Sequence, residues 1–142
     1  MAFNVLVVDD SAVMRTMVIK TLRLSGVPVG DVYQAGNGEE GLDRLHAHWV
    51  DLVLLDLNMP QMNGEELLAE IRSNPDTASV AVIVISTEGS EARIRRVKEL
   101  GAEFVHKPFR PEELRAVIRD LTGVSDDTFD AVPAVSNGSG DF

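Results

Sequence analysis

Five short apolar runs alternate with amphipathic segments over the first 123 residues, and this alternation constrains the fold more than any other feature. The runs Phe3–Val8 and Leu52–Leu55 are almost purely apolar and carry no charge, as expected for strands that are buried on both faces. The segments between the runs place apolar residues at helical spacing. Strands that alternate with helices form right-handed βαβ units and a parallel sheet covered on both sides. We therefore expect an α/β domain.

The predicted elements follow from these periods and from local start and stop signals. Ser11 is suited to cap the first helix, and we expect its apolar residues Met14, Met17, Val18 and Leu22 to face inward. We likewise expect the methionines and Trp49 to serve in packing. The predicted strands span residues 3–8, 32–35, 52–55, 80–85 and 104–105, and the predicted helices span 11–25, 39–46, 66–72, 91–100 and 111–121.

Charge and composition limit the classes of function. The net charge of −10 argues against a general nucleic-acid binder, although eight of the 13 basic residues lie between Arg93 and Arg119, where they suggest a partner surface. The absence of cysteine excludes disulfides, thiolate nucleophiles and cysteine-ligated zinc. No membrane span or export signal is visible, so we expect a cytoplasmic protein. After Gly123 the composition changes, and residues 124–142, with four acids and no base, read as a disordered acidic tail behind a domain at 1–123.

Polar side chains follow several of the predicted strands. Asp9 and Asp10 come after the first strand, Asp56 after the third, Ser86 after the fourth and Lys107 after the fifth. The carboxyl ends of parallel strands meet at one edge of the sheet, where ligands bind in open α/β folds. Three carboxylates that lie close together repel one another unless a cation joins them, and oxygen-only ligands suit Mg²⁺. The pattern predicts a site for phosphorylation of a carboxylate, with Asp56 as the nucleophile and with the Lys107 charge and the Ser86 hydroxyl acting on the same phosphoryl group.

Three motifs carry a resemblance to a known family. Val7-Val8-Asp9-Asp10-Ser11, the segment Asp56-Leu57-Asn58-Met59-Pro60-Gln61-Met62-Asn63-Gly64, and Lys107-Pro108-Phe109 resemble the receiver domain of two-component response regulators. The resemblance covers residues 3 to about 122 and is greatest to the stand-alone chemotaxis regulators. It implies a flavodoxin-like fold with strand order 2-1-3-4-5 and phosphorylation of Asp56 by a histidine kinase.

The resemblance also implies roles for individual residues. Asp9, Asp10, Asp56 and the backbone carbonyl of Asn58 would hold Mg²⁺, and a cis peptide would precede Pro108. Ser86 and Phe104 match the switch pair, with serine where threonine is commoner and phenylalanine where the best-known chemotaxis proteins have tyrosine. Asn58 and Glu88 match the positions that tune the lifetime of the phosphoryl group, and this pair is typical of fast chemotaxis regulators.

The residues are compatible with more than one function. We expect a monomeric phospho-acceptor with intrinsic autophosphatase activity. Because 19 polar residues after the domain cannot form an effector domain, we expect it to act by binding a downstream protein such as a flagellar motor switch. A phosphatase could shorten its active state. Within the same class, a phosphorelay intermediate between kinase and phosphotransferase remains the alternative. A haloacid-dehalogenase-type phosphatase is disfavoured because Asn58 stands where such enzymes carry a second aspartate, and a flavin-binding protein because no Ser/Thr-rich phosphate loop follows the first strand.

Overall fold

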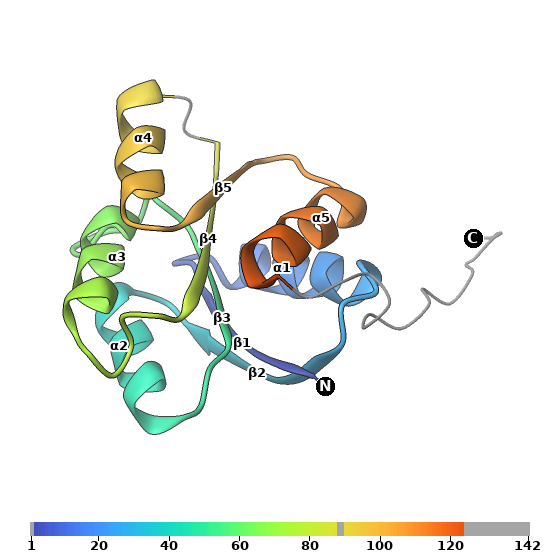
Figure 1. Ribbon diagram of the computed structural model, residues 1–142, viewed down its shortest axis with the longest axis horizontal. Coiled ribbons are helices and arrows are strands. Elements are labelled where there is room, and N and C mark those ends of the chain that lie inside the picture. The colour runs from blue at the N-terminus through green and yellow to red at the C-terminus, as the bar shows by residue number, and fades with distance from the viewer. Residues whose placement is uncertain (1, 88–89, 124–142) are drawn as a thin grey trace, which may run out of the picture.

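The computed structural model describes residues 2–87 and 90–123. Its five strands form one parallel sheet in the order β2-β1-β3-β4-β5 (Figure 1), which confirms the flavodoxin-like fold and its strand order. The strands are β1 (Phe3–Val8), β2 (Val29–Ala35), β3 (Leu52–Leu55), β4 (Ala81–Ser86) and β5 (Glu103–His106). The helices are α1 (Ala12–Leu24), α2 (Gly38–Ala47), α3 (Gly64–Ser73), α4 (Glu91–Glu99) and α5 (Pro111–Thr122).

Both faces of the sheet are buried, because alternate residues of each central strand point into two separate cores. Val5 and Val7 of β1 pack in the core that contains residues of α1 and α5. Leu6 and Val8 of the same strand pack in the core that contains residues of α2, α3 and α4. Figure 1 shows the corresponding layers, with α1 and α5 on one side of the sheet and the other three helices on the opposite side. Because the five strands are parallel, their carboxyl ends all lie at the same edge of the sheet.

Three expectations need correction. The second strand begins at Val29, three residues earlier than the predicted start, because the exposed edge of the sheet tolerates Gly30 and Asp31. Met17 was expected to face inward, but it is 56% exposed, since the buried stripe of α1 is narrow and runs through Val18 and Leu22. The expectation that Trp49 is a packing residue is also wrong, because this side chain is 78% exposed.

Some sequence expectations concern parts of the chain that the structure does not describe. The proposed acidic tail at 124–142 lies outside the described residues, as does Glu88. Within residues 2–87 and 90–123, no helix combines the length and the apolar character needed to cross a bilayer.

Arg72 of α3 connects this helix with the end of α4 and with the segment that leads into β4. Its Nε donates a hydrogen bond to the Leu100 carbonyl at 2.7 Å, and its Nη1 donates to the carbonyls of Ala78 and Val80 at 3.0 and 2.6 Å. Its Nη2 donates to the Gly101 carbonyl at 3.3 Å. Burial lowers the pKa of Arg72, and these four bonds offset the cost of desolvating its charge. Arg72 therefore fixes the end of α4 and the entry to β4 against α3.

Replacing Arg72 by methionine should lower the free energy of unfolding by about 2–4 kcal/mol, because several carbonyls lose a charged donor that methionine cannot replace. Urea unfolding measures the change. Arg95→Met is the matched control, because Arg95 is exposed on α4, and it should shift stability by no more than about 0.5 kcal/mol. Equal stabilities for the two variants would show that the Arg72 bonds contribute nothing beyond side-chain packing.

Candidate functional site

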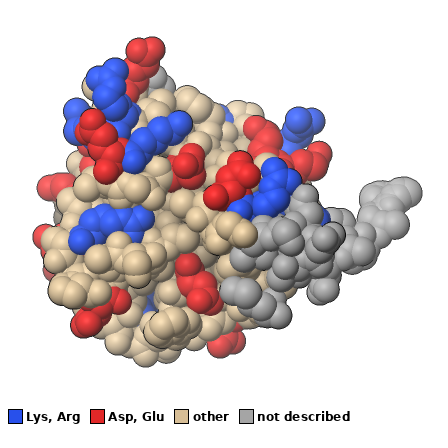
Figure 2. Space-filling model, viewed as in Figure 1, with Lys and Arg blue, Asp and Glu red and all other residues tan. Residues whose placement is uncertain are grey.

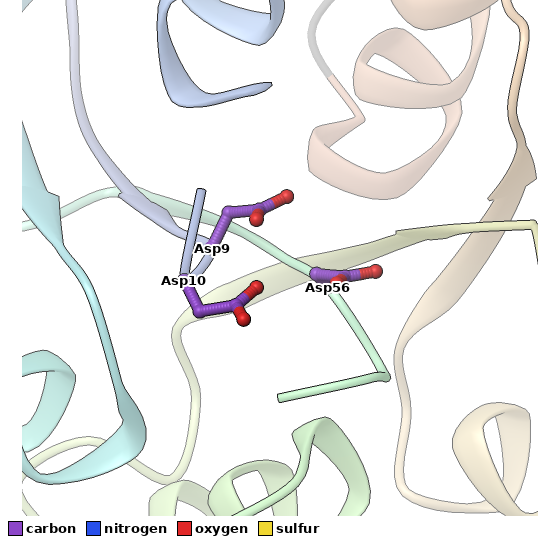
Figure 3. Close-up of side chains that lie close together, drawn as sticks. All are labelled: Asp9, Asp10 and Asp56. Carbon is purple, nitrogen blue, oxygen red and sulfur yellow. The ribbon is translucent and has the colours of Figure 1, made fainter. Parts of the chain in front are cut away.

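Three carboxylates meet at the carboxyl ends of two neighbouring strands. β1 and β3 pair in parallel with Val8 opposite Leu55, so the chain emerges from both strands at the same level. Asp9 and Asp10 follow β1 and Asp56 follows β3. One oxygen from each carboxylate lies within 4.8 Å of the others, and Figure 3 shows the three side chains close together. The convergence that the strand-end pattern predicted is therefore present.

Lys107 brings a positive charge to this cluster from the end of β5. Its Nζ lies 3.5 Å from Asp9 Oδ2 and 3.6 Å from Asp56 Oδ1, and its side chain is only 15% exposed. The backbone N–H of Lys107 donates a 3.0 Å hydrogen bond to the Ser86 carbonyl, which ties the loop to the end of β4. The Lys107–Pro108 peptide is cis, as the motif implied. The lysine thus lies between two of the acids.

Burial dominates the electrostatics of Asp56. Desolvation raises the pKa of the Asp56 carboxyl, the neighbouring Asp9 raises it further, and Lys107 and the backbone N–H of Asn58 oppose the rise. The net effect is a raised pKa, so one lysine does not fully compensate the buried acids. A divalent cation would supply the missing positive charge. Three carboxylates with oxygen-only donor chemistry fit Mg²⁺, which binds to a few carboxylates and keeps several waters.

Asp9 is held by the residue that caps α1 and by an arginine in the first turns of that helix. Its Oδ1 accepts a 2.9 Å hydrogen bond from the backbone N–H of Ser11, whose own side chain caps α1. The Asp9 carbonyl accepts from Arg15 Nη1 at 2.5 Å, and Arg15 Nε donates to Gln34 Oε1 on β2 at 3.0 Å. Sequence reasoning did not find Arg15. Arg15 lies four residues after the Ser11 cap, about one turn along the predicted helix, and this spacing is the signal that could have revealed it.

The remaining predicted residues lie around the acids rather than among them. Ser86 is the last residue of β4 and is fully buried. Phe104 is a half-buried residue of β5 that packs against the core on the α2–α4 side and meets the His106 ring edge-on at 4.8 Å. Asn58 is exposed on the loop after Asp56, and its Oδ1 accepts a hydrogen bond from Arg93 Nη1 at 3.3 Å. Arg93 is a second residue that sequence reasoning did not connect with the site.

Comparisons with known proteins point to one family. The sequence model of the response regulator receiver domain matches residues 5–119. The chain is 36% identical to chemotaxis protein CheY1 of Helicobacter pylori over 87% of its own length and 99% of the relative's. It is 35% identical to the probable chemotaxis protein CheY of Rhizobium etli, over 84% of this chain and 92% of that protein. The solved structure of chemotaxis protein CheY4 of Vibrio cholerae superposes with a TM-score of 0.74 at 31% identity, covering 85% of this chain and 99% of that one.

Proposed function

The chain belongs to the response regulator receiver domain family, and from that premise we propose that Asp56 accepts a phosphoryl group from a histidine kinase. The observation that carries the proposal is the contact of Lys107 Nζ with both Asp9 and Asp56 inside a cluster of three carboxylates. Receiver domains are phospho-acceptors, and autophosphatase activity is a general property of the family. The chain's part in signalling is therefore to hold a phosphoryl group for a limited time.

In the proposed transfer, a carboxylate oxygen of Asp56 attacks the phosphorus of a phosphohistidine. The new O–P bond forms as the P–N bond breaks, and the imidazole leaves with the bonding electrons. Lys107 is placed to neutralise an oxygen of the transferred group. In the later hydrolysis, a water oxygen attacks the phosphorus and the Asp56 O–P bond breaks. The carboxylate is restored, and the phosphoryl group leaves as inorganic phosphate with the oxygen and protons of the water.

We assign the metal ligands to Asp9, Asp10, Asp56 and the backbone carbonyl of Asn58. When bound, Mg²⁺ supplies positive charge to the phosphoryl oxygens as well as to the carboxylates. Asp9 is fixed by the Ser11 N–H and Arg15 before any ion arrives, so the protein does not need to order this ligand on binding.

For the response we propose that Ser86 and Phe104 form the switch. A phosphoryl group on Asp56 would draw the Ser86 hydroxyl toward it, which vacates space into which Phe104 rotates. The two side chains lie on neighbouring strands, where Val84 pairs with Phe104 and Ser86 with His106. Such a switch biases two discrete arrangements, and the surface that reports the change is formed by α4, β5 and α5. Figure 2 shows lysine and arginine residues gathered with acids over the α4 end of this surface.

The downstream partner that we propose is a protein of the chemotaxis machinery such as a flagellar motor switch. Its support is that relatives matched over most of their length are named chemotaxis proteins. A phosphorelay intermediate is the alternative. The two differ in how long the phosphoryl group must last, because a motor signal has to end quickly whereas a relay must conserve the group until it is passed on.

The lifetime of the phosphoryl group tests this function. After phosphotransfer from a purified histidine kinase, the labelled protein should lose its phosphoryl group within seconds to minutes. Asn58→Met should slow the loss by about tenfold, because the amide two residues after Asp56 no longer orients water, and Glu88→Leu should also slow it. Decay of radiolabel in gel-resolved samples measures the rates. A half-life of hours for the parent, or no effect of either substitution, would remove the support for chemotaxis over a relay.

A further inference from the structure

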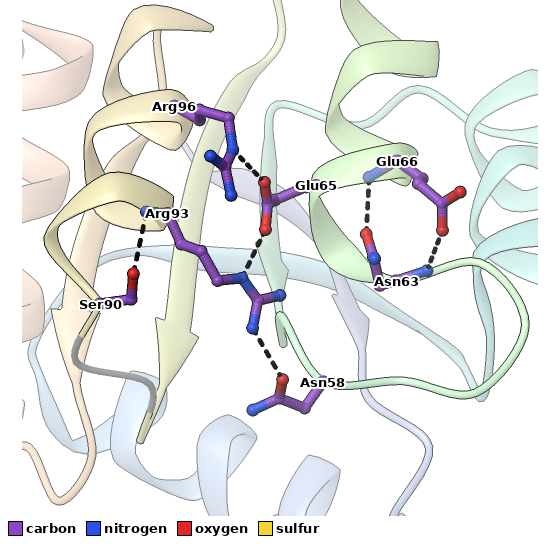
Figure 4. Close-up of polar contacts among 7 residues, drawn as sticks. All are labelled: Asn58, Asn63, Glu65, Glu66, Ser90, Arg93 and Arg96. Carbon is purple, nitrogen blue, oxygen red and sulfur yellow. Dashed lines mark hydrogen bonds and ion pairs between the residues drawn. The ribbon is translucent and has the colours of Figure 1, made fainter.

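Arg93 links the first turn of α4 to the loop that carries Asn58. Its Nε donates a 2.5 Å hydrogen bond to Glu65 Oε1 on α3, and its Nη1 donates to Asn58 Oδ1 at 3.3 Å. Figure 4 shows the guanidinium between these two acceptors. Asn58 lies 35 residues earlier in the chain, so this contact connects α4 directly with the residue that lies two positions after Asp56.

Glu65 holds the guanidinium in place. Its second carboxylate oxygen accepts a 2.8 Å hydrogen bond from Arg96 Nε, so one acid engages two arginines of α4. Burial alone would raise the pKa of Glu65, but hydrogen bonds from Arg96 and Arg93 lower it below its usual value. The side chains of Arg93 and Glu65 are only 22% and 19% exposed, so water screens the pair less than it screens a surface ion pair.

The planar shape of the arginine side chain lets its bond to Glu65 determine the orientation of the Asn58 amide. A guanidinium is planar, and its donors form a rigid fork. When Nε is fixed on Glu65, the direction of Nη1 is fixed as well, and it points at the Asn58 amide oxygen. The amide is exposed and would otherwise be free to turn about its side-chain bonds. With Oδ1 held by Arg93, the amide has one orientation.

We propose that Arg93 is a positioning residue for hydrolysis of the phosphoryl group, acting through Asn58. The inference rests on the proposed function, in which Asn58 orients the attacking water beside Asp56. Asn58 lies two residues after Asp56, so the held amide extends from the backbone beside the phosphorylated residue. Orientation of a reacting water contributes to the rate only while the groups that hold it are themselves ordered. Loss of Arg93 therefore slows dephosphorylation although Asn58, Lys107 and the three acids all remain.

Four variants and the parent test the inference, namely Arg93→Met, Arg96→Met, Asn58→Ala and the double variant Arg93→Met/Asn58→Ala. Each protein is labelled with radioactive acetyl phosphate and Mg²⁺, the donor is removed, and the loss of label is followed. Arg93→Met should slow decay by about three- to tenfold, because the amide is no longer held. Arg96→Met is the matched control, because Arg96 also hydrogen-bonds Glu65, whereas among the described residues it is Arg93 that donates to Asn58. The decay rate of Arg96→Met should stay within about twofold of the parent.

The double variant separates positioning from a general structural role. In the Asn58→Ala background, Arg93→Met should change the rate by less than about twofold, because the residue through which it acts is gone. An undiminished effect in that background, a parent-like or faster rate for Arg93→Met, or equal slowing by Arg96→Met would each overturn the inference. If Arg93→Met fails to fold, Arg93→Lys replaces it, since a single ammonium lacks the fork and should also slow decay. A parent that takes no label overturns the proposed function as well, whereas a labelled parent with an unaffected Arg93 variant overturns only this inference.

Discussion

Replacing Gly64 by alanine should destabilise the protein by about 2–4 kcal/mol, because the added methyl group would meet atoms that cannot move away independently. A Cβ at this position would lie 2.4 Å from the Asp56 carbonyl oxygen and 2.7 Å from Leu57 Cα, both of which are backbone atoms. Gly64 also donates its backbone N–H to the Leu57 carbonyl at 2.9 Å. The start of α3 is therefore pressed directly against the chain that follows β3.

The same substitution should impair the site. Relief of the clash requires the start of α3 and the end of β3 to separate, which displaces Asp56 from Lys107. We expect the free energy of unfolding and the extent of labelling by acetyl phosphate to fall together in Gly64→Ala. Gly36→Ala is the control, since its Cβ would meet Glu40 Oε1 and Arg15 Nη1 at ordinary distances of 3.5 and 3.6 Å. A stable and fully labelled Gly64→Ala protein would show that the close approach is not required.

The strands β1 and β3 were the most predictable elements of the fold, for a physical reason. β1 and β3 match the predicted bounds because both of their faces are buried, which demands continuous apolar residues. β2 lies at the edge of the sheet, and its start was missed because exposed positions permit Gly30 and Asp31. The narrow buried stripe of α1 likewise left Met17 exposed although its spacing is helical, because periodicity gives the direction of a face but not its width.

The candidate site was likewise predictable only in part. Asp9, Asp10, Asp56 and Lys107 were predictable because parallel topology brings strand ends together, whatever the details of packing. The contact between Arg93 and Asn58 was not predictable, because it joins side chains 35 residues apart on a helix and a loop. The close approach of Gly64 to Asp56 was hidden for a similar reason. The predicted helix begins at residue 66, whereas α3 begins at Gly64, where the absence of a side chain lets the helix approach the backbone of Asp56.

Asp56 should be the residue that takes the phosphoryl group, and the reaction should require Mg²⁺. Asp56→Asn keeps the shape of the side chain, but its neutral amide is a poor nucleophile toward phosphorus, so labelling should be lost almost completely. Removal of Mg²⁺ by a chelator should have the same result in the parent, because Lys107 alone does not balance the acids and the incoming phosphoryl oxygens. Asp43→Asn, which changes an exposed acid on α2, serves as the control and should be labelled like the parent.

The most direct measurement is intact-mass and peptide-level mass spectrometry of the purified protein after incubation with acetyl phosphate. With Mg²⁺, the parent and Asp43→Asn should each gain the mass of one phosphoryl group, located on the peptide that contains Asp56. Asp56→Asn, and the parent in excess chelator, should gain none. Equal labelling of Asp56→Asn, or full labelling of the parent without Mg²⁺, would contradict the assignment of Asp56 as a magnesium-dependent phosphorylation site.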